Sequence, residues 1–147
     1  MRWIIAALAV LSANAGAQPA PAALDSLFIR IDRVQSELAE ASAPLFRGAT
    51  DSRDAQPAAA VEDFLSALSE MNQWVMAAKF VECERDKEII SSFAALRYGP
   101  ALALSEDALA AVRAFEPDTE EQRVAQARAI EVIQRFYPDT ELLIGAP

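Results

Sequence analysis

The sequence predicts an all-α protein, a compact bundle of four main helices with shorter helical pieces. Alanine, the strongest helix former, accounts for 32 of the 147 residues, whereas glycine occurs four times. Apolar residues recur at alternating three- and four-residue steps, which places them on one face of a helix. No segment shows the sustained alternation of apolar and polar residues that is typical of a half-buried strand. Since proline does not fit a helix interior, we expect helices to end near the prolines at positions 44, 57, 100, 117 and 138.

The first 17 residues have the pattern of a cleaved signal peptide. Arg2 precedes an apolar run over residues 3–11, and small residues stand at the −3 and −1 positions of a cleavage site after Ala17. The alternative is a buried or membrane-spanning helix, but this run is shorter than the roughly 20 residues that cross a bilayer. We therefore expect a mature chain of residues 18–147, a single helical domain without a membrane span, in the periplasm or the medium.

The first helix is predicted over residues 24–45. Its apolar side chains form a heptad seam, with charged residues on the opposite side. The seam consists of Leu24, Leu27, Ile31, Val34, Leu38, Ala41 and Leu45. Three heptads barely reach the length of an intermolecular coiled coil, so an ordinary bundle helix is the preferred interpretation and a coiled coil the alternative.

The next stretch, residues 58–98, contains neither glycine nor proline. One continuous helix there would be about 60 Å long, which exceeds the width of a domain of this size. We therefore expect two helices, separated at the charged residues 82–88, with the apolar stripe continuing at Ile89 and Leu96. Before the break, the stripe consists of Val61, Phe64, Leu68, Met71, Val75 and Ala78.

The turn just before this break, residues 74–81, is apolar on nearly all sides. Such a helix is expected to be surrounded by others, which would put it at the centre of the bundle. The alternative is an apolar ligand pocket lined by Trp74, Met76 and Phe80.

Two further helices have clear start signals. Ser105 is a good N-cap and is followed by two acidic residues, which predicts a helix over 105–115. Thr119 with Gln122, or Asp118 with Glu121, predicts a capping box at the start of a last long helix, whose buried stripe would end at residue 136.

A short C-terminal turn is expected over residues 139–144, after Pro138. Its apolar residues Leu142, Leu143 and Ile144 would either dock on the bundle or present an apolar tail to a partner.

The composition excludes several kinds of chemistry. The chain has no histidine and one cysteine, so histidine-dependent catalysis, thiolate metal clusters and an intramolecular disulfide are impossible. No glycine-rich phosphate loop occurs, and the net charge of −9 argues against nucleic acid as a partner. We predict no catalytic residues, no cofactor and no metal site, and hence a protein that is not an enzyme.

Cys83 is of interest because an odd cysteine in an exported protein is a candidate for intermolecular pairing or for a free reactive thiol. The alternative is a small apolar residue buried at a helix end. The sequence is compatible with a monomer and with a homodimer, and the homodimer could be linked by a disulfide between two Cys83 residues.

Taken with the export signal, these exclusions predict a non-enzymatic protein-binding factor, for instance an inhibitor, an immunity-like factor, a chaperone or an assembly component. Because the charge is of one sign, it would steer the chain toward basic proteins. The alternatives are a carrier of a small apolar ligand and, behind it, a hydrolase that uses carboxylates alone.

Overall fold

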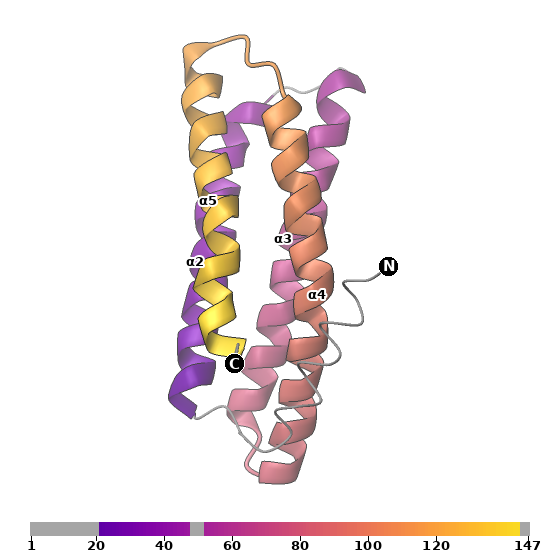
Figure 1. Cartoon of the computed structure of the whole chain (residues 1–147), viewed down its shortest axis with the longest axis vertical. Coiled ribbons are helices and arrows are strands. Elements are labelled where there is room, and N and C mark those ends of the chain that lie inside the picture. The colour runs from indigo at the N-terminus through magenta and orange to yellow at the C-terminus, as the bar shows by residue number, and fades with distance from the viewer. Residues whose placement is uncertain (1–20, 48–51, 145–147) are drawn as a thin grey trace.

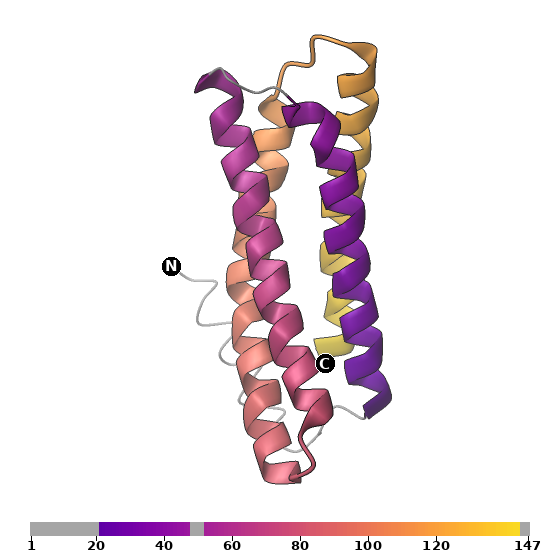
Figure 2. The same ribbon diagram turned by 180° about the vertical axis from the view of Figure 1, so that it is seen from behind.

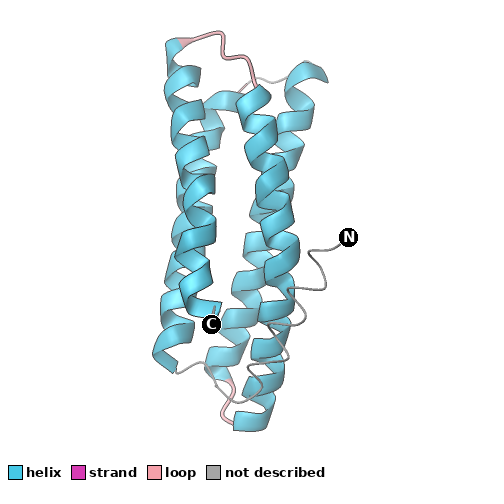
Figure 3. Ribbon diagram, in the orientation of Figure 1, coloured by secondary structure: helices cyan, strands magenta, loops and turns pink. Residues whose placement is uncertain are grey.

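The computed structural model describes residues 21–47 and 52–144. Over these residues the chain forms four helices and no strand: α2 (Pro21–Phe46), α3 (Ser52–Phe80), α4 (Glu84–Ala114) and α5 (Glu120–Ile144) (Figures 1 and 3). The predicted all-helical character is therefore confirmed. The expected signal peptide, residues 1–17, lies outside the described residues.

Consecutive helices run in opposite directions and lie side by side along the long axis of the molecule (Figures 1 and 2). Each packs against two others, so that α2, α3, α4 and α5 form a ring in chain order, which α5 closes against α2. In both views the turn between α3 and α4 extends beyond the start of α2 and the end of α5. The tip of this helical hairpin is therefore less covered than the rest of the ring.

The interior of the ring is filled by the apolar stripes of all four helices. The predicted stripe of α2 is buried from Leu27 to Leu45, and that of α3 is buried from Val61 to Ala78. Between them lie Ala101, Ala108, Val112 and Phe115 from α4 and its end, and Ala125, Ala129, Val132, Ile133 and Phe136 from α5. Phe64 and Phe136 meet edge to face, with ring centroids 5.2 Å apart. Burial of each large side chain contributes about 1.5–3 kcal/mol, so these stripes supply most of the stability.

The prediction for α4 is wrong in one respect. Segments 89–98 and 105–115 are not separate short helices, because α4 continues through Gly99 and Pro100. Ser105 is not an N-cap: it is buried within the helix, and its hydroxyl donates to the Leu102 carbonyl at 2.7 Å. Packing of α4 against both α3 and α5 offsets the hydrogen bond that Pro100 cannot donate.

Prolines also lie inside other helices, Pro44 in α2 and Pro57 in α3. The expected separate turn over residues 139–144 is instead the continuation of α5. The expected end near Pro44 is confirmed, because α2 ends two residues after it, whereas α3 begins five residues before Pro57, and α4 and α5 continue through Pro100 and Pro138. Pro117 lies in the connection between α4 and α5.

The separation of α3 from α4 is confirmed. It comprises residues 81–83, and most of the charged run forms the first turn of α4 rather than a loop. The apolar turn before it is not at the centre of the molecule. Val75 and Ala78 are buried, whereas Phe80 is 77% exposed, because the hairpin tip extends past the neighbouring helices.

A capping box joins α4 to α5 as predicted. The Gln122 backbone N–H donates to the Thr119 hydroxyl at 3.1 Å, and the Thr119 N–H donates to Gln122 Oε1 at 3.2 Å. One turn later, Gln126 Nε2 donates to the carbonyls of Val112 and Phe115 at 2.8 and 2.7 Å. These bonds satisfy carbonyls that the end of α4 leaves without a helical partner.

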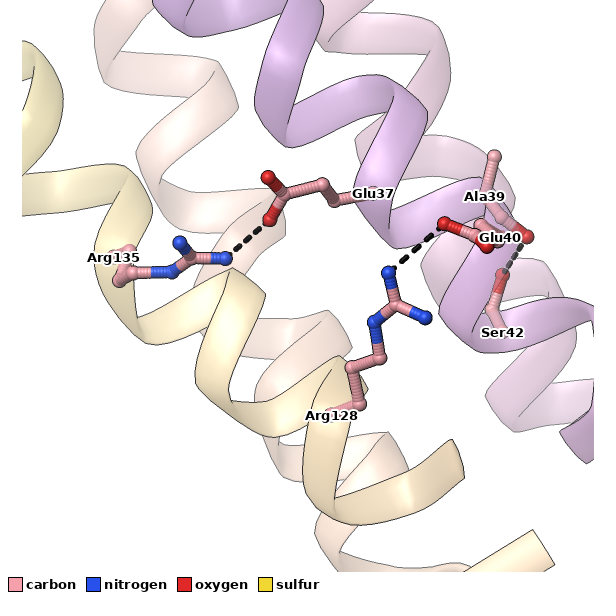
Figure 4. A network of polar contacts seen from close by, with 6 residues as sticks. All are labelled: Glu37, Ala39, Glu40, Ser42, Arg128 and Arg135. Carbon is pink, nitrogen blue, oxygen red and sulfur yellow. Dashed lines mark hydrogen bonds and ion pairs between the residues drawn. The ribbon is translucent and has the colours of Figure 1, made fainter. Parts of the chain in front are cut away.

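Ion pairs hold α5 against α2 on the outside of the ring (Figure 4). Arg128 Nη2 donates a hydrogen bond to Glu40 Oε2 at 2.9 Å. Farther along α5, Arg135 Nη2 donates a hydrogen bond to Glu37 Oε2. On α5 the two arginines lie seven residues apart, about two turns, whereas on α2 the two glutamates lie three residues apart, less than one turn, so the two pairs join the helices at neighbouring levels.

Replacing Pro100 by alanine should raise the free energy of unfolding by about 1–3 kcal/mol, because it restores a helical N–H in a continuous helix. Urea denaturation followed by circular dichroism measures this. Pro117→Ala is the matched control in a loop and should leave stability unchanged or lower it by up to about 1 kcal/mol. An unchanged or lower stability for Pro100→Ala would mean that α4 is interrupted there.

Gln126→Ala should lower the free energy of unfolding by about 1–3 kcal/mol, since two carbonyls at the end of α4 lose their donor. The exposed Gln134 on the same helix provides the control, and Gln134→Ala should change stability by less than about 0.5 kcal/mol. Equal effects of the two substitutions would show that the amide of Gln126 does not fasten α5 to α4.

Candidate functional site

Exposed apolar side chains gather on the α3–α4 side of the molecule. Six large apolar side chains are exposed among the described residues, and four of them lie at the end of α3 or in the first half of α4. They are Phe80 (77% exposed), Ile89 (48%), Phe93 (44%) and Leu96 (53%), and we call them the hairpin surface. Phe80 is exposed at the tip of the hairpin, which projects beyond α2 and α5 (Figure 2), whereas Leu96 is exposed farther along α4.

A stack of two aromatic rings supports this surface. The half-buried Trp74 of α3 lies against Phe93 of α4, with ring centroids 5.1 Å apart and an interplanar angle of 24°. Trp74 also packs against the buried core. The stack therefore holds the Phe93 ring in its exposed position in the free protein.

The three residues of the predicted ligand pocket differ in their surroundings. Trp74 stacks on Phe93, Met76 is half-buried and Phe80 extends into solvent. Neither of the two cavities described below is lined by any of the three. The pocket stays a prediction without geometric support.

The larger cavity, about 320 Å³, is a groove between α2 and α5. Its lining is Ala41, Pro44, Val124 and Ala125 with Glu40, Glu120, Glu121 and Arg128. Arginine nitrogens lie 2.9 Å from Glu40, 3.4 Å from Glu120 and 3.9 Å from Glu121, so the carboxylates already have counter-charges. The second cavity, about 250 Å³, lies between α2 and α3 and is lined by Ala39, Ser42, Ala43, Phe46, Ala58, Val61, Glu62 and Leu65.

Neither the hairpin surface nor the α2–α5 groove was predicted from the sequence. The groove depends on how two helices distant in sequence meet, and no local pattern encodes that. The apolar turn at residues 74–81 indicated unusual packing. An apolar turn of this kind, however, is found both in a helix enclosed by others and at an exposed helix end.

Cys83 is exposed at the N-cap position of α4, where its side chain makes no capping hydrogen bond. The alternative of a buried small residue is therefore wrong. Whether the thiol pairs with another molecule stays a prediction.

Among the described residues, no group of three or more acidic or cysteine side chains is placed to hold a metal ion. Asn72 Oδ1 is buried and has no hydrogen-bond partner among the described residues, but neither cavity reaches it.

Leu142, Leu143 and Ile144 belong to the last turn of α5, and their docking role stays a prediction. None of the described helices has the length and apolar character to cross a membrane.

No protein family model, no curated protein and no solved structure matches this chain.

The exposure of Cys83 predicts that one thiol per chain reacts with a thiol reagent in the native protein. Its rate should be within about tenfold of the rate in 6 M guanidinium chloride, because no unfolding step is needed to reach it. Absorbance after addition of a chromogenic disulfide measures the reaction. A thiol that reacts only in denaturant would contradict the exposed position.

Proposed function

We propose that the protein is an exported, non-enzymatic protein-binding factor that acts in the periplasm or the medium. Its mature chain, residues 18–147, would be a single compact helical bundle released by cleavage of the signal peptide. Inhibitor, immunity-like, chaperone and assembly roles all use binding of this kind. The proposal depends on one observation above all, the hairpin surface.

The hairpin surface has the properties of a protein interface. Aromatic side chains are enriched where proteins bind, and two of the four members are phenylalanines, one of them fixed by the Trp74 stack. A cluster of exposed apolar side chains is unfavourable in water. A partner that covers the cluster gains about 25 cal/mol of free energy for each Å² of apolar surface buried.

Two basic residues at the edge of the surface form ion pairs within the chain. Lys79 Nζ lies 2.6 Å from Asp25, and Arg97 Nη2 lies 2.9 Å from Glu70. Attraction to a basic partner would therefore come from the net charge of −9 over the whole chain, and would act on the rate of encounter more than on the final contact.

The two alternatives have less support. A carrier of a small apolar ligand needs an enclosed pocket, and Phe80 and Trp74 line none of the described cavities. A hydrolase using carboxylates alone needs two acids facing each other across a cleft, and those at the α2–α5 groove have arginine neighbours.

Replacing Phe80 by aspartate should lower the amount of captured partner at least tenfold, because a charge enters the exposed apolar contact. The full-length sequence is expressed with its own leader, purified after export and used as bait for proteins of the native envelope or medium. Quantitative mass spectrometry over a salt series measures the capture. A basic partner should be retained less at high salt.

Val124→Asp is the matched control, since Val124 is 62% exposed but lies at the start of α5, far from the hairpin tip. It should leave capture unchanged. Identical protein recovery with the wild-type bait and the Phe80→Asp bait would refute the proposed binding role of the surface.

A further inference from the structure

Helix α4 has a second apolar stripe on the side that faces away from the core. Its inner face carries the buried residues Ala101, Ser105, Ala108 and Val112. Leu96 lies nine residues before Ser105, which is about two and a half turns, and therefore on the opposite face of the helix. Ile89, Leu96 and Ala103 follow one another at seven-residue steps on this outer face, and all three are exposed.

This outer stripe is symmetric about Leu96. Ile89 and Ala103 lie two turns before and after it, and Arg85 and Asp107 lie about three turns before and after it. In an antiparallel pair of identical helices related by a two-fold axis, a residue n positions before the axis faces the residue n positions after it in the other copy. A stripe that is symmetric about one residue fits this requirement.

The charges at the two ends of the stripe are complementary under that symmetry. Arg85 of each copy would face Asp107 of the other, which gives two reciprocal ion pairs, one at each end of an apolar centre. Both residues are exposed, and neither forms an ion pair within the described part of the chain.

Side-chain sizes are complementary in the same register. Phe93 and Gly99 lie three residues before and after Leu96, on opposite flanks of the stripe, so the two-fold axis brings them to the same level but not into direct contact. Gly99 is exposed, and a Cβ built there would meet nothing within 4 Å, so that flank of the helix is open. Phe93 is held in its exposed position by the Trp74 stack. Ile89 would face the small side chain of Ala103.

We propose that the outer face of α4 is a homodimer interface, in which a second copy of the chain packs antiparallel across a two-fold axis at Leu96. This proposal rests on the proposed function, because it names the partner of most of the hairpin surface. The contact extends over about 33 Å of helix from Arg85 to Asp107. The net charge of −9 on each copy opposes association, but at physiological salt this repulsion is screened beyond about 8 Å.

The geometry separates the two Cys83 thiols. Each lies 13 residues from Leu96, so the two are about 39 Å apart along the paired helices and cannot form a disulfide within this dimer. The disulfide-linked homodimer is thus a different assembly from the one proposed here.

Charge reversal tests the interface. The exported full-length product is studied by sedimentation equilibrium at 150 mM salt. Arg85→Asp and Asp107→Arg should each weaken the dimer about tenfold, since each creates two like-charge contacts by symmetry, and the double variant should restore the wild-type dissociation constant. Arg113→Asp, an exposed charge of α4 outside the stripe, is the control and should have no effect. Far-UV circular dichroism verifies that all variants are folded.

Cross-linking tests the register. In a Cys83→Ser background, Leu96→Cys should form an intermolecular disulfide on oxidation, whereas the wild-type thiol should not join the copies of a dimer. A monomer at 100 μM, failure of the double variant to restore association, or cross-linking through Cys83 alone would each overturn the proposal. Loss of the dimer with continued capture of another protein through Phe80 would overturn this inference and leave the proposed function standing.

Discussion

Mutual burial of the four apolar stripes is the interaction on which the rest of this structure depends. The chain has one cysteine and hence no internal disulfide, so no covalent constraint assists the core. The stripe of α3 is buried between its neighbours over five turns, and its Phe64 meets Phe136 of α5 across the interior. The capping box, the bonds of Gln126 and the ion pairs of α2 with α5 all act on helices that this burial has already brought together.

The sequence predicted the elements whose patterns are local. The stripes of α2 and α5, the break near residue 82 and the capping box at Thr119 follow from spacing and side-chain chemistry, and the structure confirms them. The break predicted at Pro100 failed because contacts with two other helices outweigh the preference of one residue. The hairpin surface could not be predicted because Ile89 and Leu96 continue a spacing that, from sequence alone, indicates burial.

The two sides of the ring are held together in different ways. Between α2 and α5, charged pairs cover the seam from outside, and Arg128 and Arg135 extend across it to acids of α2 (Figure 4). Between α3 and α4, the seam contains the Trp74–Phe93 stack as well as the Arg97–Glu70 ion pair, and apolar side chains are exposed beside it. Ion pairs therefore cover the α2–α5 seam from outside, whereas exposed apolar side chains gather beside the α3–α4 seam.

The ring arrangement also implies an order of assembly. Its consecutive helices are joined by short connections, so α3 and α4 meet with little loss of chain entropy, whereas the Arg128–Glu40 and Arg135–Glu37 pairs join residues 88 and 98 positions apart. The hairpin should therefore form early and the α2–α5 seam last. Until the seam closes, the core face of the hairpin is exposed as well as its outer surface, and the partly folded chain is then most prone to aggregation.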